Sequence, residues 1–380
     1  MSYKASFQKQ TFLFKQPSGT SRGILTEKHA WFISLSKINT NHPTIQHSSP
    51  ESFRDVTRHP KAFGTSPVSR KLSGRHSSPV EESLGECSII PGLSPDFVSF
   101  DSYEKKLTEV CENISYYMEN LSELEPFPSI LFGLETALLG LQSQNENQLF
   151  DTPFTRGELG IPINGLIWMG SKEFMLMQIE EKLQAGFSCL KLKIGALDFE
   201  TELEILTSIR KRYTASDIEL RVDANGAFSP TDVLDKLDSL SKFHLHSIEQ
   251  PIKAGQWEEM ANICRVTPLP IALDEELIGV VGNAQKRALL ETIQPQHIIL
   301  KPSLHGGILG TTEWIHLAME HKTPWWMTSA LESNVGLNCV AQFASTFKNS
   351  LPQGLGTGGL YENNTPSKLF IDQGYIYMGH

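Results

Sequence analysis

The sequence predicts an α/β protein in which a (β/α)8-type barrel follows a smaller N-terminal α+β capping domain. Two observations carry this prediction. Along the middle of the chain, apolar segments recur every 25 to 30 residues, and each closes on a charged residue: Lys193, Asp223, Glu249, Asp274 and Lys301. One strand, one helix and two loops need about 30 residues, so this spacing is typical of a β/α repeat. Before the repeat, strand-like segments are followed by helical ones, which is typical of an α+β domain.

Length and composition limit the class of protein. The chain has 380 residues, 39% of them hydrophobic, which suffices for one large core and a smaller one. A net charge of −10 argues against a general nucleic-acid surface. No apolar run approaches the roughly 20 residues that span a bilayer, and the first residues lack a signal-peptide pattern. A cytoplasmic protein without membrane contact is therefore expected. The five scattered cysteines favour reduced thiols over disulfides or zinc ligands.

The capping domain is predicted from alternating and helical patterns of apolar residues. Pro17 to Thr20 supply a turn between its first two strands, and Asp101 is placed as the cap of its first helix. The expected strands are 4–16, 24–37 and 84–90, and the expected helices are 101–121 and 128–142. The predicted division of the chain is 1–125 for the capping domain, 126–360 for the barrel, and 361–380 for a segment that returns to the capping domain.

Residues 38–82 break this pattern. The stretch is rich in Ser, Pro, His, Thr and Arg, and between 38 and 80 it holds six Lys or Arg against two acids. We interpret it as a poorly ordered insertion that joins two strands of the capping domain. A basic docking segment is the alternative. Its four histidines are irregularly spaced, which makes a metal site there a remote option.

From residue 161 the alternation of strand and helix becomes regular, as a barrel requires. A doubly wound open sheet is the alternative fold. No GxGxxG or GxxxxGK[ST] loop follows the first strand, which weakens that alternative. The eight expected strands are 162–168, 188–194, 218–224, 245–250, 269–274, 297–302, 323–329 and 352–356, and the clearest helices are 172–185, 200–213 and 230–242.

Two lysines stand two residues apart on the second predicted strand. Lys191 and Lys193 therefore point to the same face, while apolar neighbours pack the other face. Ammonium groups inside a barrel are costly unless anions or a metal-bound ligand balance them. The alternative, two lysines at a solvent-exposed strand end, is weakened by the carboxylates on the next three strands.

Three carboxylates follow on consecutive strands and are expected to converge at the mouth of the barrel. Asp223, Glu249 and Asp274 would repel one another strongly without a cation. Oxygen-only ligands favour Mg²⁺, with Mn²⁺ as a substitute, over zinc. The neighbouring Glu275 and Glu276 are candidates for supporting partners or surface charges. The sequence thus predicts a divalent-cation site.

Lys301 is expected across the barrel from Lys193, four strands further round. This placement suggests a flat carboxylate substrate between the two lysines, with the metal and one lysine stabilising an enediolate. The other lysine, buried beside a cation, would serve as the base. A Schiff-base aldolase also uses a barrel lysine, but it needs no carboxylate triad.

With these residues in place, the chain resembles the enolase superfamily, specifically its muconate-lactonising subgroup. The motifs are KxK, DAN, EQP, DE and KP, in order and at barrel spacing, and the resemblance covers nearly the whole chain outside the 38–82 insertion. The mandelate-racemase subgroup would place a His–Asp dyad on the later strands, where this chain offers Lys301. The resemblance implies an enolase-like, modified barrel and a divalent metal.

Within the subgroup, four segments resemble o-succinylbenzoate synthases of the Bacteroidetes type. They are FKQPSGTSRGILTEKHAWFI, LGECSIIPGLS, TSALESNVGL and GLGTGGLYENN. These enzymes dehydrate 2-succinyl-6-hydroxy-2,4-cyclohexadiene-1-carboxylate in menaquinone biosynthesis, through a metal-stabilised enediolate. Dipeptide and N-acylamino acid epimerases or racemases are the alternative. Dipeptide epimerases carry an acidic DxD after the last strand, where residues 356–359 of this chain hold no acid.

The resemblance also implies roles for individual residues. Lys193 would remove the proton next to the carboxylate and return it to the departing hydroxyl, while Lys301 stabilises the enediolate. Asp223, Glu249 and Asp274 would bind the metal. The loop Thr20–Gly23 would close over the mouth. The implied substrate-binding residues are Lys191, Asn225, Ser21, Arg22, Ser329, Glu332 and Gly356.

A non-enzymatic alternative treats the barrel as a scaffold and the basic insertion as the working part. The sequence leaves open whether the protein is a monomer or a homo-oligomer. The expected partner is a small-molecule carboxylate.

Overall fold

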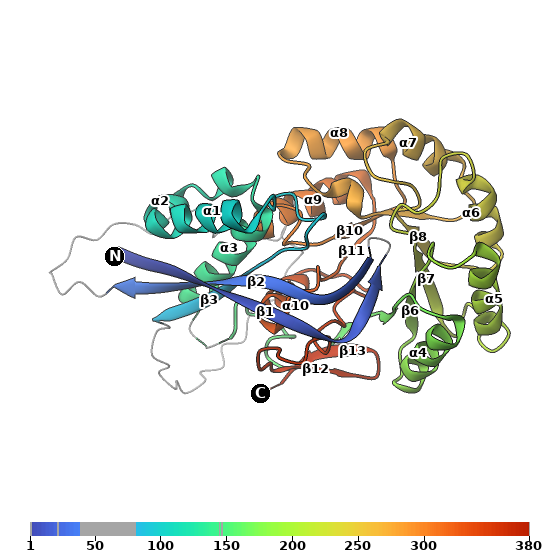
Figure 1. Ribbon diagram of the computed structural model, residues 1–380, viewed down its shortest axis with the longest axis horizontal. Helices are drawn as coiled ribbons and strands as arrows, with labels where there is room; N and C mark the ends of the chain where they lie inside the picture. Colours follow the sequence, from blue (N-terminus) through green and yellow to red (C-terminus); the bar gives the residue numbers. More distant parts are fainter. Residues whose placement is uncertain (1, 21–22, 39–80, 144, 146, 380) are drawn as a thin grey trace, which may run out of the picture.

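The structure, a computed structural model, describes residues 2–20, 23–38, 81–143, 145 and 147–379 (Figure 1). Two predicted substrate contacts, Ser21 and Arg22, and nearly all of the 38–82 insertion with its four histidines lie outside these residues. The described part divides into a small antiparallel sheet with its helices and a parallel barrel (Figure 1).

The small sheet has the order β1–β2–β3 and is antiparallel throughout. Its strands are β1 (Ser2–Thr20), β2 (Gly23–Ile38) and β3 (Glu82–Ser88). The first two pair as far as Thr20 opposite Gly23, with a register shift between Leu13 and Ser18. The predicted turn at 17–20 is therefore wrong. Pro17 lies within the register shift, where its missing N–H removes no ladder bond.

The predicted helix 101–121 is interrupted. It consists of α1 (Phe100–Glu112), α2 (Ile114–Glu119) and the short 3-10 helix η2 (Leu121–Leu124). The cap of α1 is Ser99, which forms a reciprocal capping box with Ser102, whereas Asp101 lies in the first turn. The backbone N–H and side-chain amide of Asn113 both donate to the carbonyl of Glu109, which ends α1.

Helix α3 (Pro128–Gln142) has the predicted bounds and is almost entirely buried. Leu131 and Leu134 pack in the same buried cluster as Trp31 and Ile33 of β2. Although the sequence placed residues after 125 in the barrel domain, α3 contributes its side chains to the core of the small domain. It also contacts α9 (Gly307–His321) of the barrel, so it connects the two parts.

The barrel contains seven parallel strands in sequential order, with helices around the outside (Figure 1). Isolated parallel bridges from Thr328 to Gly354 and from Ile163 to Gln353 place the predicted eighth segment, 352–356, between the last and first strands. The strands are β5 (Gly165–Ile167), β6 (Cys189–Lys193), β7 (Glu219–Asp223), β8 (Ser247–Glu249), β9 (Ile271–Leu273), β10 (His297–Leu300) and β11 (Trp325–Met327).

The helices alternate with these strands, as the spacing predicted. Helix α6 begins at Val233, three residues after Pro230, so the predicted start at 230 is wrong. The helices are α4 (Lys172–Gln184), α5 (Phe199–Arg210), α6 (Val233–Ser241), α7 (Trp257–Val266), α8 (Asn283–Ile293), α9 (Gly307–His321) and α10 (Asn334–Ala344), with a 3-10 helix η3 (Glu275–Leu277) after β9. Their apolar faces and the outer faces of the strands form one large buried cluster.

The C-terminal segment contacts both parts of the molecule. Tyr361 bridges to Phe14 of β1, and the N–H of Glu362 donates to Leu13. The hairpin of β12 (Leu369–Asp372) and β13 (Tyr375–Met378) then pairs with β4 (Ile161–Pro162) at the start of the barrel. The return to the capping domain thus involves only the first residues of the segment.

All five cysteines are unpaired, four of them buried and Cys111 partly exposed. This agrees with the predicted reduced thiols. Within the described residues, every helix is too short or too polar to cross a bilayer.

Candidate active site

The charged residues of the repeat lie together at the C-terminal ends of the barrel strands. In the parallel register Lys193 is the direct neighbour of Asp223, and Asp223 is the direct neighbour of Glu249. Asp274 and Lys301 directly follow β9 and β10. Because parallel strands end at one rim, the regular spacing along the chain becomes a cluster in space, as the sequence predicted.

Both lysines of the KxK segment reach one carboxylate. Nζ of Lys191 lies 2.9 Å, and Nζ of Lys193 2.6 Å, from Oδ2 of the fully buried Asp223. Lys191 also forms an ion pair with Glu249. Burial favours a lower pKa for Lys191, but the charges of Asp223 and Glu249 outweigh it and raise this pKa above its ordinary value. Burial acts to raise the pKa of Asp223, and the two ammonium groups outweigh it, so the pKa is lowered.

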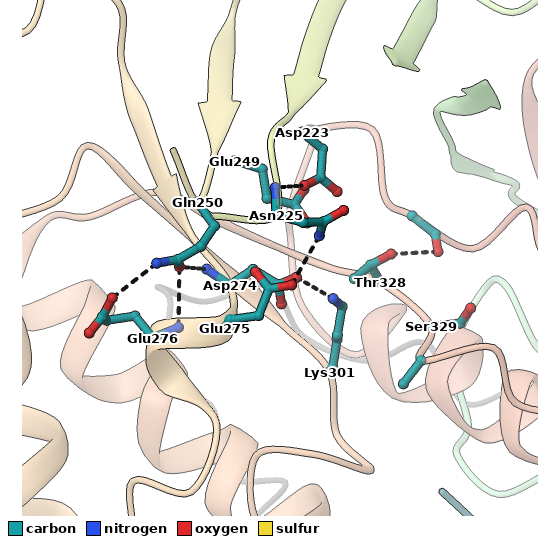
Figure 2. Close-up of polar contacts among 12 residues, drawn as sticks. Asp223, Asn225, Glu249, Gln250, Asp274, Glu275, Glu276, Lys301, Thr328 and Ser329 are labelled. Atoms are coloured by element: carbon teal, nitrogen blue, oxygen red, sulfur yellow. Dashed lines mark hydrogen bonds and ion pairs between the residues drawn. The ribbon is translucent and has the colours of Figure 1, made fainter. Parts of the chain in front are cut away.

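Lys301 occupies the opposite side of the cluster, four strands from Lys193. It forms an ion pair with the buried Asp274 (Figure 2). Burial favours a lower pKa for Lys301, but the Asp274 carboxylate outweighs it and raises this pKa. The two lysines thus face each other across three buried carboxylates, and each lysine is held by its own carboxylate.

Several buried oxygens at the centre of the cluster lack hydrogen-bond donors. Oε1 of Glu249 and Oδ1 of Asp274 have no hydrogen-bond partner in the described part of the chain. Burial, followed by the charge of Asp223, raises the pKa of Glu249 well above its ordinary value. Desolvated carboxylate oxygens without donors are the groups that a hard divalent cation binds. The donor set therefore fits Mg²⁺ or Mn²⁺.

The described residues nevertheless hold no group of three His, Cys, Asp or Glu side chains close enough to bind a metal ion. The ammonium groups of Lys191, Lys193 and Lys301 lie against the carboxylates instead. A cation bound by all three carboxylates would require some of their oxygens to turn away from these lysines.

Two strand-end residues in strained backbone conformations align the carboxylates. Asn225 has φ +44°, and Gln250 has φ +38°. The backbone N–H of Asn225 donates to Asp223 at 3.0 Å, and its Nδ2 donates to Glu275 at 2.9 Å (Figure 2). Its Oδ1 accepts from Nζ of Lys193 at 2.8 Å. Asn225 thus lies between the Asp223 carboxylate and Lys193, and its predicted contact with the substrate stays a prediction.

The side chain of Gln250 connects the loop after β8, to which it belongs, with the loop after β9. Its side-chain carbonyl accepts from the backbone N–H groups of Asp274 and Glu276, both at 3.2 Å. Its Nε2 donates to the Glu276 carboxylate at 2.9 Å (Figure 2). Glu276 is 3% exposed, so of the two roles considered for it, supporting partner or surface charge, the structure favours the first.

His305 fixes the backbone beneath Lys301. Its Nδ1 accepts the backbone N–H of Lys301 at 2.9 Å, which requires a neutral ring with the proton on Nε2. Burial lowers the pKa of His305 from 6.5 to about 3, against the opposing charge of Asp274. The neutral ring is thus the native form at all moderately acidic pH values.

This histidine is expected to make the fold acid-sensitive. Its folded pKa lies below the unfolded value, so the unfolded chain binds more protons and stability falls as pH drops from 6.5 through about 3. Between pH 7 and pH 4.5 we expect the wild type to lose roughly 2–3 kcal/mol of unfolding free energy through this group. The H305N variant should lack this loss in urea unfolding experiments. H316N, at an exposed position of α9, should retain it.

A cavity of about 160 Å³ opens above the cluster, between the barrel rim and the small domain. Its floor contains Lys191, Lys193, Asn225 and Lys301. The small domain contributes Gly23, Ile24, Leu25, Ile90, Pro91 and Leu93, and the barrel contributes Asn164, Leu166, Trp168 and the residues from Thr328 to Leu331. One end of the cavity is thus charged and the other largely apolar, as a substrate with a carboxylate and a hydrocarbon ring requires.

Most predicted substrate-binding residues line this cavity. Ser329 and Gly356 do so, and the hydroxyls of Ser329 and Thr357 lie 2.5 Å apart. Glu332 does not, because it is fully buried with its oxygens bound to the hydroxyl of Ser303 and the N–H of Ala330. The predicted contact of Glu332 with substrate is therefore wrong. Its carboxylate instead holds the backbone of Ala330, which lines the cavity.

Sequence reasoning missed several lining residues on the first and seventh strands. The N–H of Thr328 donates to the carbonyl of Leu300, the residue before Lys301, at 2.9 Å. Asn164 and Trp168 directly precede and follow the first strand, β5, and line the cavity. The interval of the charged series, continued past Lys301 and back from Lys193, reaches Thr328 and the first strand. Their side chains carry no charge, so the series of charged residues did not mark them.

Comparisons with known proteins agree with this geometry. Residues 175–379 match the family model described as enolase C-terminal domain-like. An o-succinylbenzoate synthase of Desulfotalea psychrophila is 44% identical over 98% of this chain and 98% of its own length. The solved structure of MenC from D. psychrophila LSv54 covers 99% of this chain and 100% of its own, with 38% identity and a TM-score of 0.79.

A second solved structure is a dipeptide epimerase of Enterococcus faecalis V583 complexed with Mg and a dipeptide. It is 15% identical, covers 99% of this chain and 96% of its own, and has a TM-score of 0.76. At this identity it shows the shared fold alone.

Proposed function

The chain belongs to the enolase superfamily, and we propose that it is an o-succinylbenzoate synthase. The reaction is the Mg²⁺-dependent dehydration of 2-succinyl-6-hydroxy-2,4-cyclohexadiene-1-carboxylate to 2-succinylbenzoate. Its setting would be menaquinone biosynthesis. The observation that carries the proposal is the pair of lysines, Lys193 and Lys301, facing one cavity from opposite sides above three buried carboxylates.

Lys193 acts as the base. As a neutral amine, it takes the proton from the ring carbon that bears the carboxylate, and the electron pair moves into the carboxylate as an enediolate. The C–O bond of the 6-hydroxyl then breaks, and the ammonium of Lys193 returns its proton to the leaving oxygen as water. Both steps use one face of the ring, so a single residue suffices. Asn225, 2.8 Å from Nζ, holds this amine in place.

Lys301 acts on the opposite face of the ring. Its ammonium, held by Asp274, places a positive charge where negative charge develops in the enediolate. Because this charge is fixed before the reaction, no reorganisation is needed as the transition state forms. Lys191 adds a second cation next to Asp223, where the substrate carboxylate enters.

Asp223, Glu249 and Asp274 would hold the divalent cation. When bound, it supplies positive charge to the substrate carboxylate, which acidifies the adjacent C–H bond. The donorless oxygens of Glu249 and Asp274 support this assignment, and oxygen-only ligands favour Mg²⁺ with Mn²⁺ as a substitute.

The uncharged groups at one end of the cavity support a synthase over an epimerase. The segment Gly356–Gly359, at the end of the eighth barrel segment (352–356), carries no carboxylate, so it offers no partner for a substrate ammonium. Instead, the hydroxyls of Ser329 and Thr357, hydrogen-bonded to each other, lie at the cavity wall, where we place the oxygens of the succinyl group. Substrate contacts by Ser21 and Arg22 are proposed by resemblance alone.

The direct test is a turnover assay with the cyclohexadiene carboxylate and Mg²⁺, followed by ultraviolet absorbance and mass spectrometry of the product. We expect kcat/KM of at least about 10⁴ M⁻¹s⁻¹. The D. psychrophila enzyme serves as the positive control. No product under conditions in which that enzyme is active would overturn the proposal. Exchange of the α-proton of dipeptides or N-acylamino acids in D₂O would then point to the epimerase alternative.

A further inference from the structure

A buried lysine of the small domain holds the wall of the active-site cavity. Lys28, on β2, is 5% exposed. Its ammonium donates to the backbone carbonyl of Ala330 and, at 2.7 Å, to that of Leu331. Both acceptors belong to the loop after β11, far along the chain and in the barrel. The contact therefore joins the two domains by a charged donor.

The loop residues that Lys28 binds are themselves part of the cavity surface. Ala330 and Leu331 line it, and so do Ile24 and Leu25, which precede Lys28 on the same strand. Leu331 has φ +61°, a conformation that a leucine adopts only when its surroundings impose it. The hydroxyl of Tyr361 donates to the same Leu331 carbonyl at 2.6 Å. Two donors from the outside thus fix this strained residue.

The other side of the loop is held by buried carboxylates. Glu332 accepts from the N–H of Ala330 at 2.7 Å, and Glu86 of β3 accepts from the N–H and hydroxyl of Ser333 at 2.8 and 2.6 Å. Both carboxylates are fully buried, and their negative charges stabilise the ammonium of Lys28. Burial lowers the pKa of Lys28 to about 8, with Glu332 and Glu86 opposing, so the ammonium persists at neutral pH.

We propose that Lys28 is a positioning residue for substrate binding, which sets the distance between the Ala330–Leu331 wall and the Ile24–Leu25 wall of the cavity. The proposal rests on the proposed function for the identity of the substrate. Lys28 contacts no reacting atom. Its removal should therefore weaken substrate binding much more than it slows the chemical step at Lys193 and Lys301.

The test compares K28M with K37M. Methionine keeps the apolar length of the side chain and removes the donors. Lys37 lies on the same strand and also donates to a backbone carbonyl, that of Leu141 at 2.8 Å, but this contact stays within the small domain. For K28M we expect KM to rise about tenfold, with kcat within about threefold of wild type, because charged hydrogen bonds to the wall are lost. K37M should leave both constants unchanged.

A second measurement needs no turnover. Hydrogen exchange of the peptide that covers residues 329–336 should be faster in K28M than in wild type, and unchanged in K37M. Binding of o-succinylbenzoate, measured by calorimetry, should weaken in parallel with the rise in KM. Should K28M fail to fold, Y361F removes one donor to Leu331 and should show the same changes at a smaller size.

The outcomes separate the two proposals. A lower melting temperature in K28M or Y361F with unchanged KM, product affinity and exchange would show a merely structural role and overturn the positioning proposal. An equal rise of KM in K37M would do the same. If the wild type neither turns over the substrate nor binds the product, the proposed function fails, and the exchange experiment alone decides whether Lys28 positions the loop.

Discussion

The K193M variant is expected to lose dehydration activity by about 10⁴-fold in kcat/KM. Lys193 serves first as base and then as acid, so no second group can replace it on that face of the ring. Its removal also leaves Asp223 with one ammonium partner instead of two. Steady-state assays at saturating Mg²⁺ measure the loss, and calorimetry with o-succinylbenzoate shows whether binding survives.

A matched lysine keeps this result interpretable. K172M changes a partly exposed lysine at the start of α4, whose ion pair with Glu204 lies outside the cavity. We expect it to retain wild-type activity and a wild-type melting temperature. A K193M protein that folds, binds product and still turns over at more than about a tenth of the wild-type rate would show that another residue removes the proton.

The E249Q variant should nearly abolish the metal-dependent reaction, with roughly a 10³-fold loss of kcat/KM. Glu249 is buried, and its Oε1 lacks a hydrogen-bond donor, so we assign it the central place among the metal ligands. An amide supplies one neutral oxygen where the carboxylate supplies charge. Mg²⁺ affinity, measured by calorimetry, should fall at least about 100-fold. Chelation of the wild type by EDTA should likewise remove activity, and added Mg²⁺ should restore it.

The control for this variant is E219Q. Glu219 lies at the opposite end of β7, where its carboxylate pairs with Arg221 at 2.7 Å. Because this end of the barrel is remote from the rim, Mg²⁺ affinity should not change. Wild-type activity that survives complete removal of divalent cations would contradict the metal assignment.

The barrel and the cluster of charges could be predicted because both are periodic. Lys193, Asp223, Glu249, Asp274 and Lys301 repeat at the interval of one strand and one helix, and parallel strands carry such residues to a common rim. No long-range information is needed for this step. Local signals without periodicity were less reliable. Asp101 satisfied the pattern of a helix cap, but Ser99 fills that position because Ser102 completes a capping box with it.

The residues that form or support the cavity walls could not be predicted in this way, because they show no regular spacing in the sequence. Glu332 was predicted to contact substrate, yet it is buried and accepts a hydrogen bond from the N–H of Ala330 in the cavity loop. No pattern in the sequence indicated a role for Lys28. The bond between Lys28 and Ala330 spans 302 positions of the chain.

The fold class and the five charged residues at the barrel rim follow from the amino-acid sequence alone, because strands and helices alternate at a regular interval along the chain. The set of side chains that lines the cavity, by contrast, becomes known only from the folded structure. Which residues line the cavity depends on how the small domain packs on the barrel. Contacts between segments hundreds of residues apart produce no regular spacing in the sequence from which they could be predicted.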